Sequence, residues 1–213
     1  MASLLDLKTR IRLETNKDDI ASGGEAEAAL DRAISRAIEY YQDERFWFNV
    51  GSETAVTVAS TATVARPAVR VADKVTISNS GSVSSLTKGA LGDFIENSST
   101  GVPSSYAEYG DSLYLYPIPN GAYTLTLYGV RDIAAPTLDA ESTVWTNEAY
   151  DLIAAHARFI LYRDIWRDQE GAVLAKGAIE EALGKLRRET RRRNAGGLRS
   201  DLPLSGGFSM IRG

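Results

Sequence analysis

The stretch from Leu113 to Tyr128 reads LYLYPIPNGAYTLTLY and carries the clearest secondary-structure signal in the chain. Leucine alternates with tyrosine before the central turn residues, and with threonine after them. Alternation with a period of two predicts strands that bury one face, and proline followed by Asn-Gly is typical of a turn. The stretch therefore predicts an antiparallel hairpin over 112–128 whose leucines face a core.

Strand-like composition extends on both sides of this hairpin, whereas helical patterns flank the whole strand-rich segment. Val, Thr, Ser, Gly and Tyr dominate from about residue 51 to residue 135, which is typical of strands. Apolar residues recur at helical spacing before it, from Ala26 to Tyr41, and after it, from Tyr150 to Ile165. We expect an α+β fold: a helical bundle body with an inserted antiparallel β region and an extended C-terminal arm. The predicted segments are the N-terminal helices (1–50), the β-rich region with the hairpin 112–128 (51–135), the C-terminal helices (136–194) and the arm (195–213).

The composition includes few of the side chains that commonly serve in catalysis. The chain has 213 residues, no cysteine and a single histidine, His156, so disulfides, thiolate metal sites and cysteine nucleophiles are excluded. His156 falls within a predicted helix, where it is either a lone general base or, as we expect, a hydrogen-bonded residue at a helix interface. The carboxylate pairs Asp18-Asp19 and Glu180-Glu181 are best interpreted as surface residues, because adjacent helical residues do not face each other. We expect no enzyme activity, no metal and no cofactor.

No segment of the sequence predicts contact with a membrane. No apolar run approaches the roughly 20 residues that span a bilayer, and the start, MASLLD, becomes charged too early for a signal peptide. We therefore expect the protein to be made and used without crossing a membrane.

Positive charge gathers near the C-terminus. Residues 185–213 contain eight Lys or Arg and two Asp or Glu, a net charge of +6, so the chain's total of −4 leaves −10 for residues 1–184. The arginines of 187–193 could bind phosphates of a nucleic acid or carboxylates of a protein, or could simply form a solvated helix end. Beyond them, Leu202, Leu204, Phe208 and Met210 alternate with other residues, as in peptides that add to a partner as a strand.

Several ordered motifs resemble one known family. The run GVPSSY at 101–106 precedes LYLYPIP at 113–119, YTLTLY at 123–128, Trp145 and the helix that begins near Tyr150. This order resembles the head-to-tail adaptor proteins of tailed bacteriophages, especially the short-tailed type. The motif itself covers about residues 101–145, although the layout of helices and strands extends the resemblance over most of the chain.

The resemblance implies a virion protein made in the host cytoplasm and located in the neck between head and tail. It implies a homo-oligomeric ring, typically of twelve subunits, that binds the portal protein and a tail or nozzle protein while DNA passes through the lumen without specific binding. It assigns portal docking to Arg187, Arg188, Arg191, Arg192, Arg193, Leu198, Arg199, Leu202, Leu204, Phe208, Met210 and Ile211. It assigns a tail-facing or inter-subunit surface to Tyr106, Tyr109, Tyr114, Tyr116, Pro117, Pro119, Tyr123 and Tyr128.

Two other function classes remain open at this point. The first is a nucleic-acid-binding packaging or regulatory protein that uses the arginine run. The second is an enzyme carried in the virion, such as a wall hydrolase, although the sequence offers no constellation of catalytic residues for it.

Overall fold

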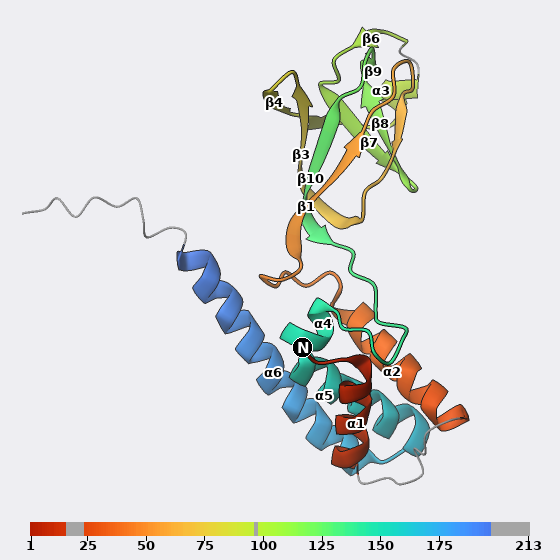
Figure 1. Cartoon of the computed structure of the whole chain (residues 1–213), viewed down its shortest axis with the longest axis vertical. Helices are drawn as coiled ribbons and strands as arrows, with labels where there is room; N and C mark the ends of the chain where they lie inside the picture. The colour runs from red at the N-terminus through yellow and green to blue at the C-terminus, as the bar shows by residue number, and fades with distance from the viewer. Residues whose placement is uncertain (16–23, 96–97, 197–213) are drawn as a thin grey trace, which may run out of the picture.

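The computed structural model describes residues 1–15, 24–95 and 98–196. Figure 1 shows two parts along the longest axis, with helices from both ends of the chain at one end and strands from its middle at the other. We call the strand-rich part, residues 50–131, the β unit. Each part has its own hydrophobic core.

Apart from the short α3, which lies within the β unit and contacts β8, the helices come from the two ends of the chain and gather around one of them, α5. Its residues Leu152 to Ala157 are all buried, as expected of a helix that is apolar on nearly all sides. Helices α1, α2 and α6 pack against it, and alanines on α2 and α5 let the backbones approach closely. The helices are α1 (Leu4–Thr15), α2 (Glu25–Tyr41), α3 (Gly92–Ile95), α4 (Val144–Glu148), α5 (Tyr150–Ile160) and α6 (Gln169–Gly196), with a π-helical turn η1 (Leu161–Trp166) after α5.

A buried lysine anchors α1 to its surroundings. Lys8 is only 3% exposed, and its Nζ lies 2.7 Å from Asp31 Oδ1 on α2 and 2.6 Å from Asp139 Oδ1 in the loop before α4. A buried ammonium group needs such partners, because desolvation penalises an unpaired charge. The ion pairs therefore fix α1 against α2 and against a loop that lies about 130 residues away in sequence.

The strands form two four-stranded sheets and a small third one. The first sheet has the order β1-β10-β3-β4, the second has β2-β8-β7-β5, and β6 pairs with β9. Side chains from both larger sheets, including Ile77 and Leu125 from the first and Leu113 and Leu115 from the second, meet in one core. The strands are β1 (Val50–Val56), β2 (Thr63–Ala65), β3 (Val69–Asn79), β4 (Ser82–Ser85), β5 (Thr87–Lys88), β6 (Thr100–Gly101), β7 (Ser105–Tyr109), β8 (Ser112–Tyr116), β9 (Ile118–Pro119) and β10 (Thr124–Arg131).

The predicted hairpin over 112–128 is wrong. The two strands exist and bury their leucines as expected, but β8 pairs with β2 and β7, whereas β10 pairs with β1 and β3. The segment between them contains β9, which pairs with β6, so it crosses from one sheet to the other. Alternation determines which face of a strand is buried but not which strand it pairs with.

The predicted fold class is also wrong. The described residues hold ten strands in three sheets, and their core shares no residue with that of the helices. Two strand pairs, β5–β7 and β6–β9, are parallel, so the β region is not simply antiparallel. The chain is better described as β sheets with helices than as a helical bundle carrying an insertion. Short strands rich in Ser and Thr gave a weak periodic signal, which understated the β unit.

Polar contacts hold the β unit against the helices. The guanidinium of Arg45, just after α2, makes two hydrogen bonds of 2.5 Å to the carboxylate of Asp73 on β3. Arg70 Nε, also on β3, donates to Asp43 Oδ1 at 2.8 Å. Paired, fork-like arginine contacts are directional, so they help to set the orientation of the β unit.

Candidate assembly surfaces

The basic run predicted from the sequence lies on the last turns of α6. Arg187 Nη2 lies 2.6 Å from Glu44 Oε1, and the guanidinium of Arg193 lies 4.5 Å from the centroid of the Trp47 ring. Glu44 and Trp47 both belong to the segment after α2. These contacts, which join residues more than 140 positions apart, had no signal in the sequence, and they hold the end of α6 against the rest of the protein.

Only part of the basic run is left free for a partner. Glu189 Oε1 accepts hydrogen bonds of 2.8 Å from both Arg192 and Arg193, and these bonds lower the pKa of Glu189. Arg188 and Arg191 are exposed, and neither is paired with a carboxylate in the part of the chain that the structure describes. Being three residues apart on a helix, they lie on one face. This pair is the available cationic feature of α6.

The other residues assigned to portal docking lie outside the described part of the chain. They are Leu198, Arg199, Leu202, Leu204, Phe208, Met210 and Ile211.

The residues assigned to a tail-facing or inter-subunit surface do not lie together on one surface of the β unit. Tyr106 is 5% exposed within the core and Pro119 is also buried, so this fold does not present them to a partner. Tyr109 is 64% exposed on β7, and Tyr128 is 43% exposed on β10 in the other sheet. The remaining four are half-buried: Tyr114, Tyr116, Pro117 and Tyr123.

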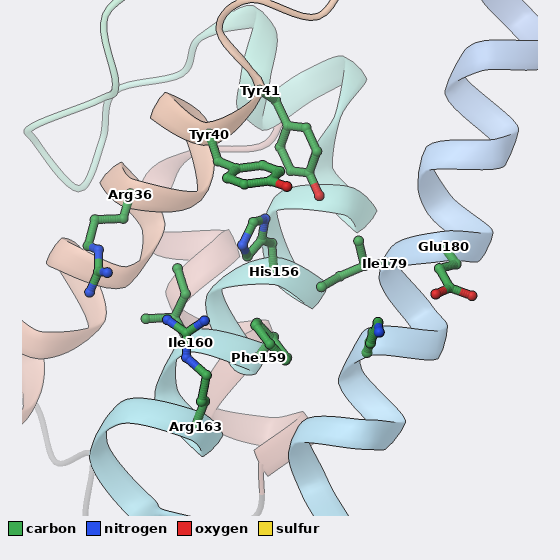
Figure 2. A pocket seen from close by; sticks show the side chains of 10 residues that line it. Arg36, Tyr40, Tyr41, His156, Phe159, Ile160, Arg163, Ile179 and Glu180 are labelled. Atoms are coloured by element: carbon green, nitrogen blue, oxygen red, sulfur yellow. The ribbon is translucent and has the colours of Figure 1, made fainter. Parts of the chain in front are cut away.

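His156 lines a pocket of about 390 Å³ between α2, α5 and α6. Figure 2 shows its imidazole next to Tyr40 and Tyr41 of α2, with ring centroids 4.8 and 5.2 Å away in edge-to-face geometry. Arg36, Arg163, Lys176 and Glu180 are also among the lining residues. The expected hydrogen bond at a helix interface is not there, since His156 Nδ1 is buried without a partner among the described residues.

The environment of His156 keeps its imidazole neutral. Burial, followed by the positive charges of Arg163 and Arg36, lowers its pKa from 6.5 to about 4. Such a group is a weak base at neutral pH, and no carboxylate among the described residues orients it by a hydrogen bond. The pocket therefore gives no support to the enzyme alternative.

Acidification should destabilise the protein through His156. Between pH 6.5 and about 4 the unfolded chain binds a proton at this residue that the folded chain does not bind. We expect the free energy of unfolding to fall by up to about 3 kcal/mol as the pH drops through this window, and to lose this dependence below it. Urea titrations at a series of pH values measure the effect.

The control for this titration is His156→Gln, which keeps a polar side chain but cannot be protonated. It should lose the pH dependence between pH 5 and 6.5, where carboxylates remain ionised in both states. An equal slope in both proteins would contradict the assignment to His156.

Glu180 and Glu181 do not share a metal site among the described residues. Glu181 Oε1 lies 3.0 Å from Lys185 Nζ in a surface ion pair one helical turn apart, while its neighbour Glu180 lines the pocket of His156. Asp18 and Asp19 lie outside the described residues. Within the described ranges, no group of His, Cys, Asp and Glu is arranged to hold a metal ion.

None of the helices described between residues 4 and 196 is both long enough and apolar enough to cross a membrane.

Comparison with known families identifies the chain. The family model described as SU10 adaptor protein matches residues 2–201, which include every described helix and strand. No curated protein matches the chain. The match confirms the resemblance to phage head-to-tail adaptors, and the matched range extends well beyond the motif at 101–145. The chain therefore belongs to the SU10 adaptor protein family, a family of phage adaptor proteins.

Proposed function

We propose that the protein forms a ring of twelve subunits that joins the portal at the head vertex to the tail and lets DNA pass through its lumen. Membership of an adaptor family supports a location in the virion neck and a structural, non-enzymatic role. The observation that carries the proposal is the free cationic pair Arg188 and Arg191 near the end of a 28-residue helix. Figure 1 shows this helix extending beyond the other helices.

In this proposal the parts of the chain have different tasks. The helices of 1–50 and 136–194 form the part of the ring next to the portal, and α6 directs its arginines at carboxylates on the portal. Residues 195–213, which lie outside the described part, dock on the portal as an arm. The segment 51–135 faces the tail or the neighbouring subunit. The net charge of −10 over residues 1–184 would keep DNA from adhering if it lines the lumen.

Reversing the charges of the free pair, Arg188 and Arg191, should weaken portal binding. We expect Arg188→Glu with Arg191→Glu to reduce affinity for the cognate portal at least about tenfold, because attraction to carboxylates becomes repulsion. Co-sedimentation of purified chain with portal measures the affinity. The matched control is Arg32→Glu with Lys176→Glu, which makes the same charge change at exposed positions outside the run.

Other outcomes of this experiment separate the competing functions. If the control and the test variant bind the portal as tightly as the original chain, α6 is not the docking element. If the original chain instead retains DNA with steep salt dependence, and the test variant does not, the protein is a nucleic-acid-binding packaging or regulatory protein. A chain ending at Asn194 tests the arm in the same assay, and we expect it to lose portal binding.

A further inference from the structure

The outer surface of the first sheet is nearly free of charge. Because Leu125 and Leu127 face the core, their neighbours on β10 and the residues paired with those neighbours lie on the opposite side. We call this surface face A. It consists of Ser52, Thr54, Val56, Lys74, Thr76, Ser78, Val83, Ser85, Thr124, Thr126 and Tyr128, of which Thr76 is covered by its neighbours at 5% exposure.

Lys74 is the single charged member of face A, in a chain of which 24% of residues are charged. It is exposed, and no carboxylate of the described residues pairs with it. Val56 and Val83 on the same face are 61% and 66% exposed. Charged residues are depleted at the centre of protein interfaces, and the low charge of face A agrees with that.

The outer surface of the second sheet is also poor in charged residues, but it is rich in tyrosine. Leu113 and Leu115 face the core, so the alternate residues of β8 and their partners face outward. We call this surface face B. It consists of Thr63, Ala65, Thr87, Ser105, Ala107, Tyr109, Ser112, Tyr114 and Tyr116. Ala107 is covered by its neighbours at 1% exposure, and the Tyr116 ring contacts Phe94 of α3, so the open part of face B lies at Ala65, Thr87 and Tyr109.

Face B contains no charged residue and is rich in tyrosine. Tyr109 and Tyr114 contact each other edge to face, with centroids 6.4 Å apart, and Tyr109 is largely exposed. The nearby charge on β7, Glu108, belongs to the inner side of the strand and pairs with Lys88 at 3.0 Å. Tyrosine is enriched at protein interfaces because its ring packs while its hydroxyl still forms hydrogen bonds.

Faces A and B point away from each other, because the two sheets enclose one core between them. Figure 1 shows β3 and β4 on one side of the β unit and β8 on the other. A closed ring of identical subunits needs this arrangement, since each subunit must present two different surfaces on opposite sides. The two faces are also complementary: Lys74 is an unpaired cation, and tyrosine rings attract cations.

We propose that neighbouring subunits of the ring meet through their β units, with face A of one copy against face B of the next. Lys74 of one copy then lies against the tyrosines of face B in its neighbour. This inference rests on the proposed ring, and it assigns Tyr109 and Tyr114 to subunit contacts rather than to the tail. Two surfaces that together carry one charge lose less on desolvation than a pair of charged surfaces would, which favours a second copy over a charged partner.

The absence of cysteine in the sequence makes cross-linking a direct test. Single cysteines are placed at exposed positions of face A (Thr54→Cys, Thr124→Cys) and face B (Ala65→Cys, Thr87→Cys), with Glu170→Cys on α6 as the control. Rings are assembled on cognate portal, treated with a short bis-maleimide and separated in denaturing gels. An A-variant mixed with a B-variant should give dimers, and one chain carrying both cysteines should give a ladder of multimers.

Each other outcome overturns the inference. Dimers formed by an A-variant alone would mean that face A meets itself. Rings seen by microscopy without any A-to-B cross-link, or with a yield no higher than the Glu170→Cys control, would mean that the ring closes through other surfaces, and the proposed function would stand. If no ring forms on the portal with any protein, including the original chain, the proposed function fails and the inference fails with it.

Discussion

Gly129→Ala is expected to reduce the free energy of unfolding by about 4 kcal/mol. Losses of this size arise from backbone clashes and large core defects. A Cβ at this position would lie 1.9 Å from the carbonyl oxygen of Val71 on β3, far inside any allowed contact. The strand register shifts between Tyr128 and Gly129, which brings the two backbones together. The backbone of β10 cannot easily move away from Val71 to relieve this clash, because β10 is hydrogen-bonded to β1 on one side and to β3 on the other.

Urea unfolding followed by circular dichroism measures this effect. The matched control is Gly177→Ala on α6, where a Cβ would meet nothing within 4 Å. That substitution should stabilise the protein by about 0.5–1 kcal/mol, since alanine is the better helix former. A Gly129→Ala protein within about 1 kcal/mol of the original would show that β3 and β10 separate more easily than their register indicates.

Trp145→Ala should have an effect of similar size in the helical part, again about 4 kcal/mol. Trp145 is fully buried and packs edge to face against Phe46 and Phe48, with centroids 6.2 and 5.2 Å away. Its indole Nε1 donates a hydrogen bond of 3.2 Å to the carbonyl oxygen of Ile133. Truncation would leave a large cavity where the chain returns from the β unit to the helices.

Trp145→Phe separates the two contributions to this effect. It keeps an aromatic ring in the cluster and removes only the indole donor, because the Ile133 carbonyl still accepts a hydrogen bond of 2.6 Å from Gln42 Nε2. We therefore expect a loss of about 1 kcal/mol. Urea unfolding monitored by circular dichroism compares the variants without relying on tryptophan fluorescence. Equal losses in both variants would assign the stabilisation to the hydrogen bond rather than to packing.

Periodicity in the sequence predicted which side chains are buried more reliably than how the elements are arranged. Ile34 and Ile38 on α2, and Leu113 and Leu125 in the strands, are buried as their spacing predicts. The pairing of the strands was missed, because the same alternation suits a hairpin and a crossover between two sheets. The partners of β8 and β10 distinguish the two, and the crossing segment holds only the two-residue strand β9, which is too short to give a periodic signal.

The sequence predicted the residues of the candidate surfaces only in part, because their exposure also depends on contacts with distant segments. The basic character of α6 is local and can be read from the sequence, but the ion pair of Arg187 with Glu44 and the contact of Arg193 with the Trp47 ring involve residues that are remote in sequence. Likewise, the aromatic surroundings of His156 come from Tyr40 and Tyr41 on another helix. Tyr106 shared a motif with exposed tyrosines, yet it lies in the core. Contacts between segments distant in sequence determine whether such a side chain is buried or exposed.

The most direct test of the adaptor account is electron cryo-microscopy of the original chain mixed with its cognate portal. The account predicts a closed ring coaxial with the portal, with the end of α6 against the portal and the β units in contact with one another. A ring that binds the portal through its β units would contradict the assigned orientation. Portal particles that carry no additional ring at saturating protein would contradict the adaptor function itself.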